Sequence, residues 1–212
     1  MSGTGSIGHA FRELGAEVTS LDCDPKAGAD ICCDVMDWQP DEPPGYWDVI
    51  WFSPPCQEFS IALTTRERRL EPAMAIVRRC LELIEQLQPR VWFMENPYTG
   101  LLPKTELCRD LPHRVVSYCN WGSPTHLDRK LTWIATNCTG WQPNPPCSHN
   151  TPCPHLENGR HPATAQRGPS MGKGGRDKRK NSREQLYSMP HGLCLSIATA
   201  ATQACHPQSL GN

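Results

Sequence analysis

The sequence predicts an α/β fold with a doubly wound, mostly parallel sheet and a small loop-rich insert. Short apolar runs alternate with a helical spacing of apolar side chains through roughly the first hundred residues, which is typical of this class. Residues 138–170 are instead rich in Pro, Cys, His and Asn and show no periodicity. We therefore expect three parts: residues 1–137, residues 138–182, and a C-terminal helical segment, residues 183–212, that packs back on the first.

The individual elements follow from periodicity and from the residues that end them. A glycine-rich loop leads into a short helix at HAFRELG, which Gly15 closes. Between Leu70 and Gln88 the apolar side chains lie on one face of a predicted helix and the charged ones on the other. Helical spacing returns after Pro190. The predicted strands are, in chain order, residues 17–22, a short run that ends at Ile31, and residues 46–52, 90–94, 114–118 and 131–136.

Size and composition restrict the class of protein. The chain has 212 residues and a formal net charge of −1, so it can bury a core of its own and any surface that binds nucleic acid is a local patch. Its twelve cysteines are not arranged as the framework of a small secreted domain. The sequence shows neither a signal peptide nor an apolar stretch long enough to cross a bilayer. These features predict an intracellular protein, in the cytoplasm or nucleoid, or in the nucleus of a eukaryote, that is not secreted.

A glycine-rich loop with acidic residues after the next strands indicates a nucleotide-like ligand. The loop GTGSIG (residues 3–8) opens a helix, and Asp22 and Asp24 end the following strand. Glycines let the backbone approach a ligand, and a carboxylate accepts hydrogen bonds from ribose hydroxyls. Asp34 lies near the end of a third element. The motif is weak and a plain glycine turn explains it equally well; an adenosyl ligand without phosphates fits at least as well as a dinucleotide.

A cysteine and a glutamate follow two neighbouring apolar strands. Pro54 and Pro55 lack an N–H donor, so the strand before them stops and Cys56 is held on a stiff loop past its end. The segment FMENP delivers Glu95 to the same edge, where ligands bind in α/β sheets. A free cysteine is more often a small buried residue, and a lone glutamate is usually solvated. Together, the two favour a nucleophile beside a general acid or base.

Five segments of the sequence, GTGSIGHAF, LDCDP, SPPCQEFS, FMENP and YCNWGSPTHLDRKLTWIAT, follow the order and approximate spacing of the DNA cytosine-C5 methyltransferase family. The C-terminal half, through CSHNTPCPHLENGRHPATAQRG and LYSMPHGLCLSI, is similar to small phage and prophage-type members. The resemblance covers nearly the whole chain. It implies a Rossmann-like domain, residues 1–137, that binds S-adenosylmethionine (SAM) and methylates C5 of a cytosine flipped out of double-stranded DNA. Residues 138–182 would form the target-recognition region.

The resemblance also implies roles for individual residues. Cys56 would be the thiolate that adds to C6 of the cytosine, its pKa lowered by local donors, and Glu95 would hold and protonate N3. Asn96 would fix the loop geometry, and Arg129 would hydrogen-bond the cytosine O2. The cofactor would be bound by Gly3, Gly5, Ser6, Ile7, Asp22, Cys23, Asp34, Val35 and Pro54.

Two departures from the family pattern bear on these expectations. The family has an apolar first strand where this sequence reads Met1-Ser2-Gly3, so a partner or a missing N-terminal segment would complete the sheet, and the chain would be a fragment, a shortened product or a degenerate copy. Of a glutamine and two arginines in the family pattern, only Arg129 remains in frame. Three alternatives stay open: a catalytically silent nucleic-acid-binding or partner protein, an exocyclic-amino DNA methyltransferase, and a tRNA cytosine-C5 methyltransferase.

Cysteine and histidine residues in the insert predict a structural zinc site. Zinc takes four sulfur or nitrogen ligands in a tetrahedron. We take Cys147, Cys153 and His161 as the firmest ligands, with Cys138 as the fourth and His149 or His155 as alternatives to it. A proline-rich loop without a metal is the competing interpretation.

The run GKGGRDKRKNSR (residues 172–183) is strongly basic. As an arm that contacts phosphates, it would add salt-dependent affinity for DNA without sequence preference. A solvated tail is the alternative interpretation of the same run.

Overall fold

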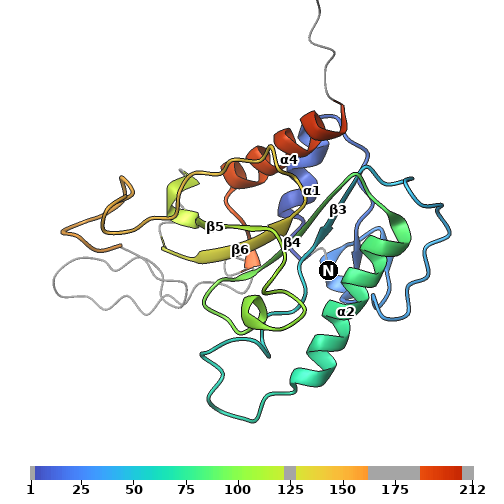
Figure 1. Ribbon diagram of the computed structural model, residues 1–212, viewed down its shortest axis with the longest axis horizontal. Helices are drawn as coiled ribbons and strands as arrows, with labels where there is room; N and C mark the ends of the chain where they lie inside the picture. The colour runs from blue at the N-terminus through green and yellow to red at the C-terminus, as the bar shows by residue number, and fades with distance from the viewer. Residues whose placement is uncertain (1–2, 122–127, 162–186, 207–212) are drawn as a thin grey trace, which may run out of the picture.

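The computed structural model of the chain describes residues 3–121, 128–161 and 187–206 and has three layers (Figure 1). Helices α1 (Ser6–Glu13) and α4 (His191–Cys205) lie together on one face of a sheet, and α2 (Leu70–Leu87) covers the other face. The strands are β1 (Leu21–Asp22), β2 (Ile31–Cys32), β3 (Val49–Phe52), β4 (Val91–Pro97), β5 (His113–Ser117) and β6 (Leu131–Thr136). Short 3-10 helices are η1 (Pro25–Ala27), η2 (Leu102–Lys104) and η3 (Tyr118–Trp121).

The strands form two sheets, and their directions are mixed. Strands β1 and β2 pair in parallel as a two-stranded sheet, and the larger sheet has the order β3-β4-β6-β5. Strands β3 and β4 are parallel, whereas β6 runs antiparallel to both β4 and β5. The α/β class is therefore confirmed. Strands β3, β4 and β5 run in the same direction, as a mostly parallel sheet predicts, and β6 is the exception. No α-helix stands between β5 and β6 in the described residues, and a direct return of the chain favours antiparallel pairing.

The outer edges of β1 and β3 have no paired strand in the described residues. Within the described residues, β1 pairs with β2 alone and β3 pairs with β4 alone. The side chains of β3 next to this edge are half-buried at Val49, Ile50 and Trp51, in contrast to Phe52, which is buried. A strand that completes the sheet, as the resemblance implies, stays a prediction.

The core is divided by the larger sheet. Successive strand residues face opposite sides, so Phe93 packs with α1 and α4 while Met94 packs with α2. The same alternation places Ile134 in the first cluster and Ala135 in the second. Helix α2 ends where Gln88 adopts a left-handed conformation (φ 46°) before Pro89, which cannot continue a helix.

Helix α4 returns the chain to its first helix. Met189 donates from its backbone N–H to Ser6 Oγ at 3.3 Å, and His191 Nε2 lies 2.8 Å from Glu13 Oε2. The apolar side chains of α4 pack with Ala10 and Phe11 of α1. Segments separated by nearly the whole length of the chain therefore share one core.

Three further observations concern the sequence-based expectations. All twelve cysteines are free thiols. No helix in the described part of the chain is both long and apolar enough to cross a membrane. The basic run at residues 172–183 lies outside the described residues, as do Thr125, His126 and Leu127 of the stretch that precedes Arg129.

Candidate active site and metal cluster

Cys56 follows β3 on a loop that is fixed to the neighbouring strand. The buried Asn96 side chain donates from Nδ2 to the Pro54 carbonyl at 2.9 Å, which joins β4 to the loop directly before the cysteine. Further along, Leu101 donates its backbone N–H to the Phe59 carbonyl at 2.9 Å. The loops after β3 and β4 are thus held at two points, and Cys56 itself stays partly exposed.

Glu95 lies within β4 and not beyond its end. Strand β4 continues to Pro97, and Glu95 is paired with Ile134 of β6. The prediction that this strand stops before Glu95 is wrong, because Pro97 is tolerated as the last residue of the strand, where it pairs with Thr132. Glu95 and Asn96 are neighbours in a strand, so their side chains point to opposite faces.

The charges of Cys56, Glu95 and Lys130 act on one another. Burial raises the pKa of the Cys56 thiol, the Glu95 carboxylate raises it further, and Lys130 opposes both effects. Burial also raises the pKa of Glu95, and Lys130 again acts in the opposite direction. The expected lowering of the Cys56 pKa is therefore wrong for this state of the protein, because desolvation and a nearby negative charge outweigh one cation. Because these charges act on one another, we assign the three groups to one site.

Arg129 and Lys130 are directed to different places. Arg129 Nε donates to the Cys147 carbonyl at 2.9 Å, whereas Lys130 Nζ lies 4.7 Å from the centre of the Tyr118 ring and acts on Cys56 and Glu95. Successive side chains of extended backbone alternate in direction, so the two cannot serve the same site. In this structure Lys130, and not Arg129, is the cation that acts on Cys56 and Glu95. The alternation leading into β6 is the signal that could have identified Lys130.

The glycine-rich loop meets the end of β1. Gly3 and Gly5 have positive φ values of 55° and 71°, and a Cβ added at Gly3 would meet nothing within 4 Å. Asp22 Oδ2 accepts from the Gly3 N–H at 2.9 Å, and Asp22 Oδ1 accepts from the Asp24 N–H at 3.0 Å. These two backbone donors fix the position of the Asp22 carboxylate at the glycine-rich loop.

The other predicted cofactor residues are spread around the same edge. Cys23 and Asp34 are exposed after β1 and β2, with Asp34 Oδ1 accepting from the Met36 N–H at 3.0 Å. Val35 is buried against α2, and Ile7 packs against the core on the other face. Ser6 Oγ is already engaged by Thr4 and Met189, while Pro54 is buried next to Asn96. The carboxylates of Asp22 and Asp34 thus follow β1 and β2, where polar groups of a ligand could meet them.

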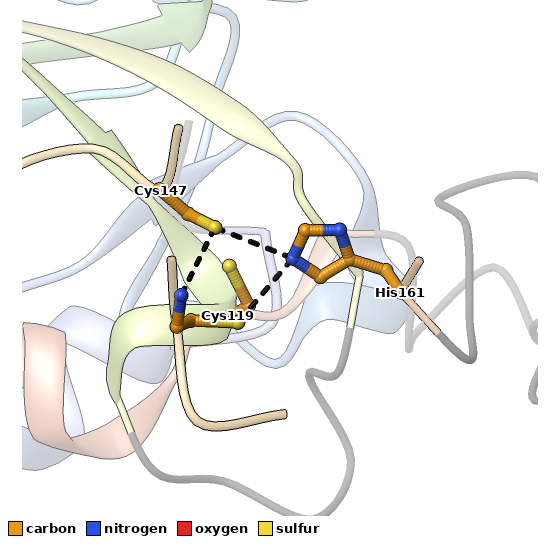
Figure 2. Close-up of side chains that lie close together, drawn as sticks. Cys119, Cys147 and His161 are labelled. Carbon is orange, nitrogen blue, oxygen red and sulfur yellow. Dashed lines mark hydrogen bonds between the residues drawn. The ribbon is translucent and has the colours of Figure 1, made fainter. Parts of the chain in front are cut away.

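A separate cluster joins the insert to the end of β5. Figure 2 shows Cys119 and Cys147 with His161 turned toward them. The Sγ atoms of Cys119, Cys147 and Cys153 and one ring nitrogen of His161 all lie within 4.8 Å of one another. The three cysteines are buried, and His161 is half-buried. Cys147, Cys153 and His161, predicted from the sequence as neighbouring ligands, lie together in the structure.

The predicted fourth ligand is wrong. Cys138 lies in the main core, where its Sγ is 3.8 Å from the Ala200 carbonyl, because it directly follows β6 and packs under α4. Its place in the cluster is taken by Cys119 from η3, which the sequence analysis missed. His149 is exposed, and neither it nor His155 joins the cluster. Cys119 lies in an apolar run, so nothing in its local sequence distinguishes it from a core cysteine.

Comparisons with known proteins agree with this site. The family described as C-5 cytosine-specific DNA methylase matches residues 2–106, the part that carries the glycine loop, Cys56 and Glu95. A protein named "Probable DNA (cytosine-5)-methyltransferase" from Frog virus 3 (isolate Goorha) is 29% identical over 197 residues, which is 81% of this chain and 84% of the viral protein. The chain is thus similar to C-5 cytosine-specific DNA methylases, most clearly in the part that carries the glycine loop, Cys56 and Glu95.

Proposed function

We propose that this chain transfers a methyl group from SAM to C5 of a cytosine in double-stranded DNA through a covalent bond between Cys56 and C6 of the base. The observation that supports this most is the Asn96–Pro54 hydrogen bond of 2.9 Å, which fixes the Cys56 loop against the strand that carries Glu95. A nucleophile and an acid held by one rigid connection are what addition across the C5–C6 bond requires.

The raised pKa of Glu95, caused by burial, suits it to the acid role. A protonated Glu95 donates its proton to N3 of the cytosine, which withdraws electrons from the ring as Cys56 adds to C6. Proton loss from Glu95 to N3 and from Cys56 to solvent precedes formation of the S–C6 bond. Lys130 favours the thiolate, because its positive charge lowers the pKa of Cys56 against the effect of burial.

The addition makes C5 electron-rich, and SAM supplies an electrophilic methyl group to this carbon. The S–C6 bond then breaks when a base removes the proton from C5, and N3 returns its proton to Glu95. Cys56 leaves as a thiolate and regains a proton from solvent, so each residue ends in its starting state. The base has to be turned out of the duplex for Cys56 to reach C6, because a stacked cytosine hides that atom.

The remaining residues would position the two substrates. Gly3, Gly5, Ser6 and Ile7 would place the loop and the start of α1 against SAM, with Asp22 on the ribose, Cys23 and Val35 beside the adenine, Asp34 on its amino group and Pro54 next to the sulfonium side. Lys130, in place of Arg129, would face the cytosine O2, and Arg129 would act through the recognition region. The basic run at residues 172–183 stays predicted as an arm that contacts phosphates.

The test is covalent trapping on duplex DNA that contains 5-fluorocytosine in varied sequence contexts, with SAM present. Fluorine at C5 prevents the final proton loss, so a working enzyme stays attached to the DNA. We expect an adduct that survives denaturation with the wild type and with Cys32→Ala, an exposed cysteine on β2, but not with Cys56→Ala. An adduct that Cys56→Ala retains would refute the assignment of the nucleophile. The lack of an adduct in every context would favour the silent binding protein.

A further inference from the structure

We propose that Cys119, Cys147, Cys153 and His161 bind one zinc ion and that this ion holds the insert against the strand that enters the catalytic site. The site joins chain segments that are distant in sequence, and within the described residues it is the one group of this kind. It shares no residue with the site of Cys56 and Glu95 and takes no part in the methyl transfer proposed above.

The distances match a tetrahedral site. With Zn–S bonds of about 2.3 Å and a Zn–N bond of about 2.0–2.1 Å, the S···N edge of a tetrahedron is about 3.6 Å and the S···S edge is about 3.8 Å. His161 Nε2 lies 3.5 Å from Cys147 Sγ and 3.4 Å from Cys153 Sγ (Figure 2). All four donor atoms lie within 4.8 Å of one another, so a shift of about an ångström at most closes the tetrahedron.

The chemistry of the donors selects the metal. Three thiolates and one imidazole are soft or borderline ligands, which favour Zn²⁺ over Mg²⁺ or Ca²⁺. With all four positions supplied by the protein, no site is open for water, and this is typical of a structural zinc ion rather than a catalytic one. Cys119, Cys147 and Cys153 are 0%, 2% and 6% exposed, so the three cysteine ligands are shielded from solvent.

The surrounding hydrogen bonds hold the ligands in place. Cys153 donates its backbone N–H to Cys147 Sγ at 3.3 Å, which orients this sulfur. The Cys147 N–H donates to Ser117 Oγ at 2.8 Å, and Asn120 Nδ2 donates to the Pro145 carbonyl at 2.6 Å. Both connections run from the end of β5 and η3 to the insert. The ligands on the two sides are thus aligned by contacts outside the cluster.

The insert has little else to order it. Residues 138–161 contain no helix or strand, apart from a bridge between Glu157 and Arg160. Cys138 and Trp141 pack in the main core, whereas Cys147 and Cys153 form a small core with Cys119 and with Leu156 as its one apolar neighbour. So small a cluster buries too little apolar area to fix a loop of this length. Binding of a metal supplies that stability directly, because the site exists in the folded state alone.

The ion would also be connected, through Arg129, to the segment that carries Lys130 and leads into β6. The Cys147 carbonyl, on a proposed ligand residue, accepts from Arg129 Nε at 2.9 Å, and Arg129 immediately precedes Lys130. Loss of the metal would release this contact and with it the segment that leads into β6. This last step rests on the proposed function, because it assigns Lys130 to the cytosine site.

The first experiment measures the metal itself. The full chain, produced in zinc-supplemented medium, is analysed for metal content, and a metal-stripped sample is titrated with Co²⁺. We expect about one zinc per chain and, with Co²⁺, a thiolate-to-metal charge-transfer band together with the intense visible bands of a tetrahedral ion. A chain that holds no zinc, takes up no Co²⁺ or carries a disulfide among these cysteines would overturn the proposal.

Matched variants identify the ligands. Cys119→Ser and Cys138→Ser each change a buried cysteine, but only Cys119 belongs to the cluster. We expect the affinity for Co²⁺ to fall more than about 100-fold in Cys119→Ser, beyond the loss seen when an outer-shell partner is removed, and to stay unchanged in Cys138→Ser. Cys153→His keeps a ligand at its position, so it is expected to retain the ion and to show an altered spectrum. Equal loss in both serine variants would overturn the assignment of Cys119.

The link to Arg129 has a separate readout. Hydrogen exchange of residues 145–153 is compared between the zinc-bound and stripped proteins, and the trapping assay is then run on both. We expect faster exchange and less trapping without the metal. Faster exchange with unchanged trapping would leave the zinc site standing and overturn its connection to the catalytic strand. The absence of trapping in both samples would instead count against the proposed function.

Discussion

Replacing Asn96 with alanine tests whether the loop that carries Cys56 is held from the neighbouring strand. The substitution removes the Nδ2 donor and leaves the Pro54 carbonyl without this 2.9 Å partner in a buried position, where Asn96 is 1% exposed. An unsatisfied buried acceptor costs about 1–3 kcal/mol. For a chain of this length each kcal/mol lowers the melting temperature by about 2–4 °C, so we expect a decrease of about 2–12 °C.

The assay combines thermal unfolding with adduct formation on 5-fluorocytosine DNA. Asn137→Ala is the matched control, because Asn137 Nδ2 also donates to a backbone carbonyl beside β4, that of Arg90 at 3.0 Å, but the side chain is exposed and water can replace it. We expect Asn96→Ala to lose stability and most of its adduct formation, and Asn137→Ala to keep its adduct with a loss within about 1 kcal/mol. An unchanged melting temperature for Asn96→Ala, or an equal loss of adduct in both variants, would refute the reasoning.

Three other predictions concern the larger sheet and the loops at its edge. A Cβ at Gly100 would lie 3.1 Å from the Pro97 carbonyl oxygen and 3.2 Å from that of Phe59, so Gly100→Ala is expected to lower the free energy of unfolding in urea by about 1–3 kcal/mol. At Gly140 an added Cβ would meet nothing within 4 Å, so Gly140→Ala should cost less. Similar losses in the two variants would count against this prediction. Because burial puts the folded pKa of Glu95 above its unfolded value, its stabilising contribution is present below the unfolded pKa and lost as pH rises through the folded one. The melting temperature of Glu95→Gln relative to wild type should therefore increase with pH, and a flat difference would contradict this. Finally, a short β-branched apolar extension before Met1 should raise the melting temperature by pairing with the open edges of β1 and β3, and a version with proline at alternate positions should not.

The sequence was most informative where local periodicity decides the structure. Helix α2 runs from Leu70 to Leu87 against a predicted Leu70 to Gln88, and β6 matches its predicted residues, because both carry a regular apolar pattern that packing preserves. The reversed direction of β6 was not predicted, since pairing depends on how the chain returns and not on the pattern of the strand itself. The prediction of residues 17–22 as a strand was too long, and just Leu21 and Asp22 pair with a neighbour.

At the site, residue types were easier to predict than partners. Pro54 and Pro55 identified the Cys56 loop, because proline restricts the backbone wherever it occurs. The choice between Cys119 and Cys138 instead depended on which loop folds back on which, and both cysteines follow apolar runs of similar character. Arg129 and Lys130 are a second example, because a shift of one residue in the strand register would exchange the directions of their side chains.

The contact between α1 and α4 has a consequence for how the protein is made. The loop proposed to hold SAM opens α1, and α1 packs on a helix that is synthesised long after it. Contacts so distant in sequence form slowly, because the intervening chain has to close a long loop first. The nascent chain would therefore expose Phe11 and the apolar side of β4 until α4 has left the ribosome. Any truncation that removes α4 would act at the other end of the chain, on the cofactor loop.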